Sequence, residues 1–135
     1  MLKFNPTTPI RFYYAEDGDY VPGQGATKTW KLLKSGEYDT FFCEWIGTYG
    51  DRALSAEALG IKDSATIRTF FNPTIYDKLR TERVIIVKNA DTEAIKEDGT
   101  PDKNNHNVYE LWGGVDNVRE ENRFMEFRAR RYEGL

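Results

Sequence analysis

The clearest hydrophobic pattern in the chain is a pair of strand-like runs between residues 65 and 87. The first run, residues 65–71, is rich in β-branched and aromatic residues and is broken by Asn72-Pro73, because proline has no amide proton and favours extended geometry in the residue before it. A charged bridge leads to the second run, Val84-Ile85-Ile86-Val87. A short, continuous apolar run of this kind predicts a strand covered on both faces. We expect the rest of the chain to pair with, or pack against, these two strands.

Further strands are predicted on either side of this pair. Residues 10–15 form a strand candidate that ends at the acidic turn 16–19, and the glycine- and proline-containing segment 20–29 predicts a loop. Residues 30–33 predict a short strand. In residues 40–46 both alternating faces are largely apolar, which predicts a strand in the middle of the sheet with Glu44 at a rim or paired.

The C-terminal part predicts a hairpin. Residues 108–112 and 123–131 are two strand candidates, joined through Gly113-Gly114 and a charged link. In the last strand, alternation points Met125, Phe127 and Ala129 inward and Glu126, Arg128 and Arg130 outward. The polar segment 90–107 predicts a long hairpin tip between residues 84–88 and 108–112.

One segment has helical character. Residues 51–59 (DRALSAEAL) are mostly good helix formers, with Asp51 as a candidate cap and Gly60 as the stop. This is the only helix we predict from the sequence.

These elements predict a mainly β fold, namely a small barrel- or sandwich-like sheet of about six strands with one short α-helix and long loops. The 135 residues suit a single domain, 1–135, with an N-terminal arm at 1–8 that Phe4 and Pro6 could dock and a long loop insertion at 90–107. The 14% aromatic content favours sheet. No signal-peptide pattern and no apolar run of membrane-spanning length is found, so we expect a soluble protein made in the cytoplasm.

No catalytic, metal-binding or cofactor-binding signature is found in the sequence. His106 lies in an asparagine-rich loop without HxxxH or CxxC spacing, and the single cysteine, Cys43, lies in an apolar strand that favours an inert core thiol. Gly113-Gly114 lacks the spacing of a phosphate loop. The acidic pairs lie in turn-like stretches, where carboxylates are common: Asp17/Asp19, Asp98/Asp102 and Glu120/Glu121. We therefore expect neither an enzyme nor a cofactor. A small hydrolase with a site not visible in the sequence is kept as an alternative, beside the two functions named below.

The sharpest charge feature is a basic cluster near the C-terminus, made of Arg123, Arg128, Arg130 and Arg131 with aromatic residues between them. Such a strand could bind single-stranded nucleic acid on a barrel face. The net charge of -3 favours instead an outward face matched by acidic neighbours and by partner subunits. We expect Trp30, Trp45 and Trp112 to pack in the core or between subunits.

The order of these segments resembles the head–tail connector proteins of tailed bacteriophages, and in particular the head-closure (stopper) group. The residues that carry the resemblance are EWIGTYGDRALSAEALGIKDSATIRTFFNPTI, then RVIIV, then YELWGGVDNVREENRFMEFRARR, which together cover roughly residues 40–131. The resemblance implies a small β-barrel or sandwich with one short helix, assembled as a homo-oligomeric ring around the DNA channel.

The resemblance also implies partners and a location. The ring would dock on the phage adaptor or portal, offer a surface to the tail or tail-completion protein, and surround packaged double-stranded DNA without sequence specificity, in the neck of the virion and not in a membrane. The loop that projects into the channel would include Tyr49, Asp51, Arg52, Glu57, Lys62 and Asp63. Six-fold and twelve-fold rings both remain open. The alternative from another class is a small β-barrel that binds single-stranded nucleic acid.

Overall fold

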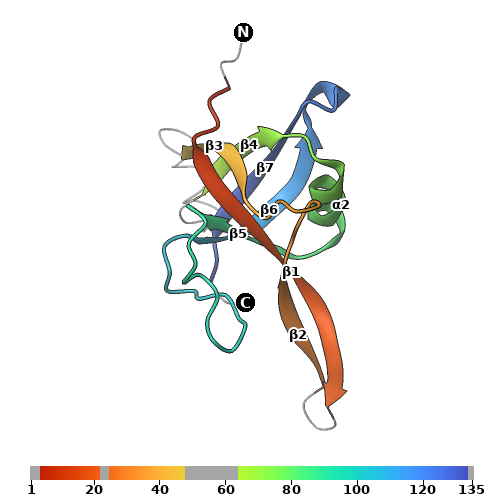
Figure 1. The fold of residues 1–135 in the computed structure, drawn as a ribbon, viewed down its shortest axis with the longest axis vertical. Helices are drawn as coiled ribbons and strands as arrows, with labels where there is room; N and C mark the ends of the chain where they lie inside the picture. Colours follow the sequence, from red (N-terminus) through yellow and green to blue (C-terminus); the bar gives the residue numbers. More distant parts are fainter. Residues whose placement is uncertain (1–3, 22–24, 48–63, 134–135) are drawn as a thin grey trace.

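The structure, a computed structural model, describes residues 4–21, 25–47 and 64–133 and is mainly β (Figure 1). Its strands are β1 (Thr8–Val21), β2 (Gly25–Leu32), β3 (Phe41–Gly47), β4 (Ala65–Phe70), β5 (Val84–Lys88), β6 (Val108–Asn117) and β7 (Phe124–Arg131). One α-helix, α2 (Pro73–Thr81), and one short 3₁₀ turn, η1 (Val118–Glu120), complete the described elements.

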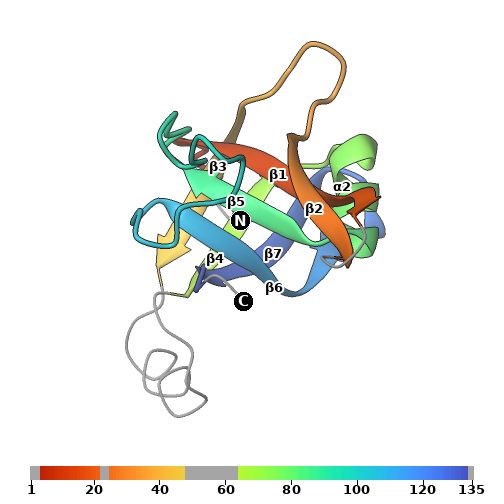
Figure 2. The same cartoon turned by 90° about the horizontal axis from the view of Figure 1, so that it is seen from below.

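Six of the strands close into an antiparallel barrel (Figure 2). The order is β1-β3-β4-β7-β6-β5, and the β1–β5 pairing closes the circle. The seventh strand, β2, pairs with β1 alone among the described strands. The predicted fold class is confirmed. The two runs identified from the hydrophobic pattern are β4 and β5, and between them they pair with β1, β3, β6 and β7.

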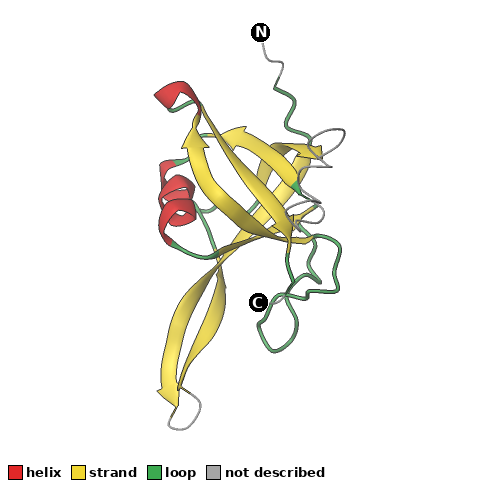
Figure 3. Ribbon diagram, turned by 180° about the vertical axis from the view of Figure 1, so that it is seen from behind, coloured by secondary structure: helices red, strands yellow, loops and turns green. Residues whose placement is uncertain are grey.

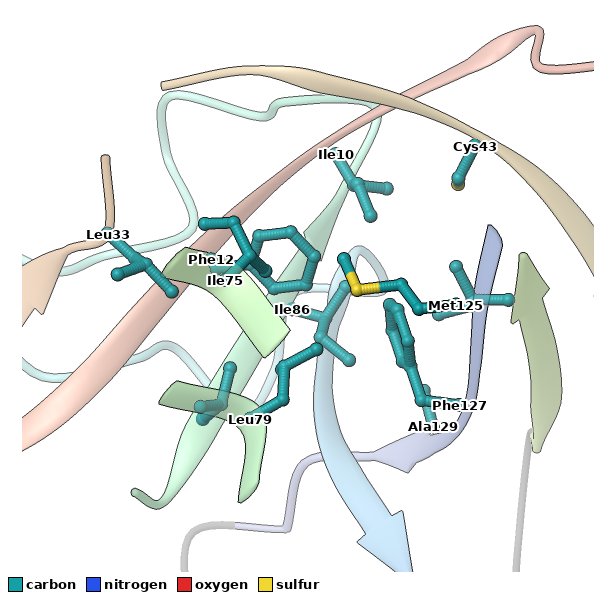
Figure 4. Close-up of a cluster of buried hydrophobic side chains, with 12 residues drawn as sticks. Ile10, Phe12, Leu33, Cys43, Ile75, Leu79, Ile86, Met125, Phe127 and Ala129 are labelled. Carbon is teal, nitrogen blue, oxygen red and sulfur yellow. The ribbon is translucent and has the colours of Figure 1, made fainter. Parts of the chain in front are cut away.

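The barrel is filled by alternate side chains of its strands (Figure 4). Phe12, Ile67, Met125 and Phe127 are among its fully buried residues, and the Phe12 and Phe127 rings lie 5.8 Å apart. Met125, Phe127 and Ala129 all point into this core, as the alternation of the last strand predicts. Strand β3 lies between β1 and β4, which confirms its predicted central position.

Strand β5 is buried on both faces, as predicted from its continuous apolar run. Val84 and Ile86 belong to the barrel core, whereas Ile85 and Val87 belong to a second cluster with Ala94 and Tyr132. The segment 90–107 therefore covers the outside of β5. It joins β5 to β6, which pair antiparallel, and this confirms the predicted hairpin.

The segment predicted as a charged bridge after the first organising strand is in fact helix α2. Pro73 lies in the first turn of the helix, where a missing amide proton costs nothing, and Asn72 caps the turn by accepting hydrogen bonds from the Thr74 and Ile75 amides. Ile75 and Leu79, four residues apart, are buried in the barrel core. The prediction was wrong because a proline that ends a strand is equally suited to the first turn of a helix. The helix predicted at residues 51–59 lies outside the described residues.

The predicted turn at 16–19 and loop at 20–29 are replaced by strands. Strand β1 continues through the acidic stretch to Val21, and β2 begins at Gly25. The register pairs Glu16 with Thr29 and Asp17 with Lys28, and a register shift between Asp17 and Tyr20 accommodates the intervening residues. Cross-strand pairing thus overrides the local turn propensity of this stretch. The two strands form a ribbon that projects away from the barrel (Figure 3).

The predicted turn at Gly113-Gly114 is also wrong. Both glycines lie within β6, where the register with β7 shifts between Trp112 and Val115, and Gly113 has a φ of 78°. The glycines therefore form a β-bulge. The chain reverses only after Asn117, whose side chain is hydrogen-bonded to Asn122 across the turn.

Candidate functional site

The outer face of β7 carries two of the predicted basic residues. Alternation along the strand places Arg128 and Arg130 on this face, opposite Trp112 and Glu110 of β6. The Arg128 guanidinium lies 5.7 Å from the centre of the Trp112 ring, and Arg130 Nε donates a hydrogen bond of 2.8 Å to Glu110 Oε1. One arginine is therefore stacked on an aromatic ring and the other is neutralised by a carboxylate.

Glu110 also lies near a third cation. Its Oε2 atom is 3.8 Å from Arg83 Nη2, and the Arg83 guanidinium lies over the rings of Trp30 and Tyr132, at 5.6 and 6.0 Å from their centres. Arg83 thus joins β2, β6 and the end of β7. The guanidinium groups of Arg83 and Arg130 are therefore both held by contacts with Glu110 or with aromatic rings of the chain.

The remaining two predicted basic residues are separated along β7. Arg123 precedes the strand, with its guanidinium 5.4 Å from the Phe124 ring, whereas Arg131 ends the strand opposite Tyr109. Eight residues of extended chain place their backbones about 26 Å apart. The four arginines predicted as one face are thus not assembled into one patch.

The middle of the outer face is a row of alternating charge across three strands. Glu44 of β3 pairs in register with Arg68 of β4, which pairs in turn with Glu126 of β7. Arg68 forms an ion pair of 2.6 Å with Glu126. Glu44 Oε2 accepts a hydrogen bond of 2.9 Å from the Asn5 amide. Glu44 was predicted to lie either at a rim of the sheet or in a paired position, and it is paired.

An aromatic row that the sequence reasoning missed lies at one end of this face. Phe42 of β3 is paired with Pro9 of β1, and Phe70 of β4 is paired with Phe124 of β7. Phe42 and Phe70 are next to each other across β3 and β4, because each lies one residue from the Cys43–Thr69 pair that joins these strands. Phe42 and Phe70 remain 55% and 59% exposed. The signal that could have predicted this row is the alternation along each strand, which places Phe42 and Phe70 on the face opposite to the buried residues beside them.

The N-terminal arm docks on this aromatic row. The Phe4 ring lies 4.9 Å from Phe70 and 4.8 Å from Phe124. Phe4, one of the two residues expected to dock the arm, thus contacts the barrel.

The groups considered for catalysis occupy structural positions in the described part of the chain. Cys43 is fully buried, and burial raises the pKa of its thiol to about 12, which disfavours the nucleophilic thiolate. His106 is exposed in the 90–107 segment. Asp98 and Asp102 accept hydrogen bonds from the Thr100 and Asn104 amides, as turn-forming carboxylates do. Among the described residues no group of three or more His, Cys, Asp or Glu side chains could hold a metal ion.

The residues predicted to face a channel all lie outside the described residues. They are Tyr49, Asp51, Arg52, Glu57, Lys62 and Asp63.

Of the three tryptophans, Trp45 packs against the barrel core with its ring 4.8 Å from that of Tyr109, and Trp30 packs against the second cluster.

No family model matches the chain, and no curated protein or solved structure matches it. Within the described residues, no helix combines the length and the apolar character needed to cross a bilayer.

Proposed function

We propose that this chain is a structural protein of the bacteriophage neck, of the head-closure type, which assembles as a ring between the head and the tail. The observation that carries the proposal is the closed six-stranded barrel with a two-stranded ribbon projecting from it. A small barrel with one short helix is the fold that the sequence resemblance implies. Projecting strands suit a protein whose work is to contact neighbouring subunits.

The surface chemistry supports a role in assembly. The charges on the outer face are largely matched within the chain, as in the Arg68–Glu126 and Arg130–Glu110 pairs. A wall that surrounds packaged double-stranded DNA without gripping it needs such a balanced surface, because unmatched basic residues would bind phosphates. The exposed Phe42 and Phe70 offer an apolar surface suited to a protein partner, such as an adaptor, the portal or a tail-completion protein.

A second candidate function is binding of single-stranded nucleic acid. The observation that favours it is Arg128, which is exposed and stacked on Trp112 on the barrel face, an arrangement on which a base could stack. The separation of Arg123 from Arg131 along β7 weakens this alternative, because a strand-binding groove needs cations that follow one backbone.

The first test removes the gene from the phage or prophage that encodes it. A head-closure role predicts lysates that contain heads without attached tails, with packaged DNA lost from them, and rescue by the wild-type gene in trans. Normal tailed particles would overturn the proposed role.

The second test separates the two functions in vitro. The wild-type chain and the R128A/W112A variant are titrated with single-stranded oligonucleotides at several salt concentrations. The connector role predicts only weak binding in both proteins. Tight, strongly salt-dependent binding that the double variant loses would favour the nucleic-acid module.

A further inference from the structure

The β1–β2 ribbon has two open edges. The Ala15 amide donates a hydrogen bond to the Arg83 carbonyl, and beyond it, from Glu16 to Val21, β1 pairs with β2 alone among the described strands. Strand β2 likewise has no described partner on its other side (Figure 1). A two-stranded ribbon is marginally stable in water and presents unpaired amides and carbonyls on both sides.

The two edges carry opposite charge. The projecting part of β1, residues 16–21, has three acidic residues and no basic ones, namely Glu16, Asp17 and Asp19. Strand β2 has two lysines, Lys28 and Lys31, and no acidic residue. Within one copy the two strands already attract each other, since Lys31 Nζ lies 2.6 Å from Glu16 Oε2.

We propose that the ribbons of neighbouring copies add to one another edge to edge, with β2 of one copy pairing antiparallel with the acidic part of β1 of the next. This inference rests on the proposed ring and names the surface that builds it. The occupant of each edge is therefore a second copy of this chain.

Charge selects this arrangement over the alternatives. A two-fold pairing of β2 with β2 would oppose lysine to lysine, and a pairing of β1 with β1 would oppose carboxylate to carboxylate, and like charges directly opposite each other in a sheet are unfavourable. The head-to-tail pairing alone places acidic β1 beside basic β2. A head-to-tail contact gives a closed ring when its rotation closes.

Opposite signs on the two edges also distinguish docking from protection. Charged residues on edge strands commonly prevent aggregation. Protection against every form of stacking would be achieved with one sign on both edges. One acidic edge and one basic edge disfavour only the pairing of β1 with β1 and of β2 with β2. They favour the pairing of β2 of one copy with β1 of the next.

The experiment uses two charge-reversal variants of the full chain, D17K and K28E. When either variant assembles alone, β2 of one copy and β1 of the next carry the same charge at positions 28 and 17. When the two variants alternate in an equimolar mixture, these positions carry opposite charges at every contact between copies. We expect each variant alone to need about tenfold more protein for assembly, because replacing an attractive cross-strand pair with a repulsive one shifts association by about 1.4 kcal/mol. The mixture is expected to assemble at the wild-type concentration.

Two controls protect the interpretation. Asp17 and Lys28 are also partners within one ribbon, so the double variant D17K/K28E, which restores complementarity within and between copies, should assemble alone. Circular dichroism of each variant checks that the barrel is folded. Native mass spectrometry measures assembly, and hydrogen exchange of the β2 amides should slow when copies associate.

Three outcomes would overturn the strand-pairing inference. Variants that assemble as the wild type does would show that the edges do not meet, and the proposed neck function would survive with another ring contact. Assembly of K28E with wild type as readily as with D17K would show two-fold β2 pairing, because both partners carry Lys28 on β2. A wild-type chain that is monomeric at every attainable concentration would overturn self-pairing, while the gene-removal test would still decide the proposed function separately.

Discussion

Arg68 and Glu126, 58 residues apart in the chain, are joined by two hydrogen bonds to a single oxygen. Arg68 Nε and Nη2 donate to Glu126 Oε2 at 3.0 and 2.6 Å across the β4–β7 pair. The side chains are only 18% and 34% exposed, so solvent screens this pair less than an ordinary surface ion pair. The contact fixes two strands of the barrel wall and neutralises its outer face.

We predict that this ion pair contributes measurably to stability. A double-mutant cycle with R68M and E126Q should give a coupling free energy of about 1 kcal/mol in chemical denaturation, and the coupling should fall with added salt. The matched control is the more exposed pair Lys31–Glu16, for which a smaller coupling is expected. Equal coupling for the two pairs would contradict the role assigned to partial burial.

The cap of helix α2 provides a second prediction. Asn72 accepts hydrogen bonds from the Thr74 and Ile75 amides and donates one of 2.9 Å to Ser35 Oγ. N72A should lower the free energy of unfolding by about 1 kcal/mol. N72D keeps the acceptor and loses only the donor, so its loss should be smaller. If N72D and N72A were equally destabilised, the cap would not be the stabilising element.

Cys43 predicts a pH dependence of stability. Burial raises the pKa of this thiol from 9.0 to about 12 in the folded chain. The folded state therefore holds a proton that the unfolded state loses first, so its contribution to stability is complete below pH 9 and is lost as the pH rises towards 12. The C43A variant should lack this component of the alkaline loss. A native thiol that reacts rapidly with a disulfide reagent at mild pH would contradict the assigned burial.

Asp91 predicts the opposite dependence in the 90–107 segment. Hydrogen bonds from the Asn105 and Asn107 side chains, and then from the Glu93 amide, hold the pKa of this carboxyl below its ordinary value of 3.8. Their contribution is present above that value and is lost as the pH falls through the lower folded pKa. Both acid and the D91N variant should lower the hydrogen-exchange protection factors of residues 90–107, each taken relative to the intrinsic exchange rate at the same pH, while those of β7 stay unchanged. Unchanged protection factors in the segment would show that Asp91 does not hold it.

The sequence predicted the elements whose pattern is local. Val84 to Val87 form a strand buried on both faces because each side chain is apolar, and the alternation of Met125, Phe127 and Ala129 is visible within one strand. Helix α2 was missed because it buries only Ile75 and Leu79, too few residues for a helical period to stand out beside Asn72-Pro73. The strand through residues 16–21 was missed because its support is pairing with β2, which no local pattern displays.

The candidate surfaces were less predictable than the fold. The grouping of Phe4, Phe70 and Phe124 depends on lateral register between strands and on the path of the arm. The four arginines looked like one cluster in sequence, but extended geometry spreads residues 123–131 along the whole barrel wall. Charge matching by Glu110 and Glu126 likewise requires the register of the sheet.

The measurement that tests the central proposal most directly is native mass spectrometry of the purified wild-type chain over a range of concentrations, with and without a candidate adaptor ring. We expect a discrete closed ring of six or twelve copies, or stoichiometric capture by the adaptor. A chain that stays monomeric, ignores the adaptor and instead forms a salt-sensitive complex with single-stranded oligonucleotides would contradict it.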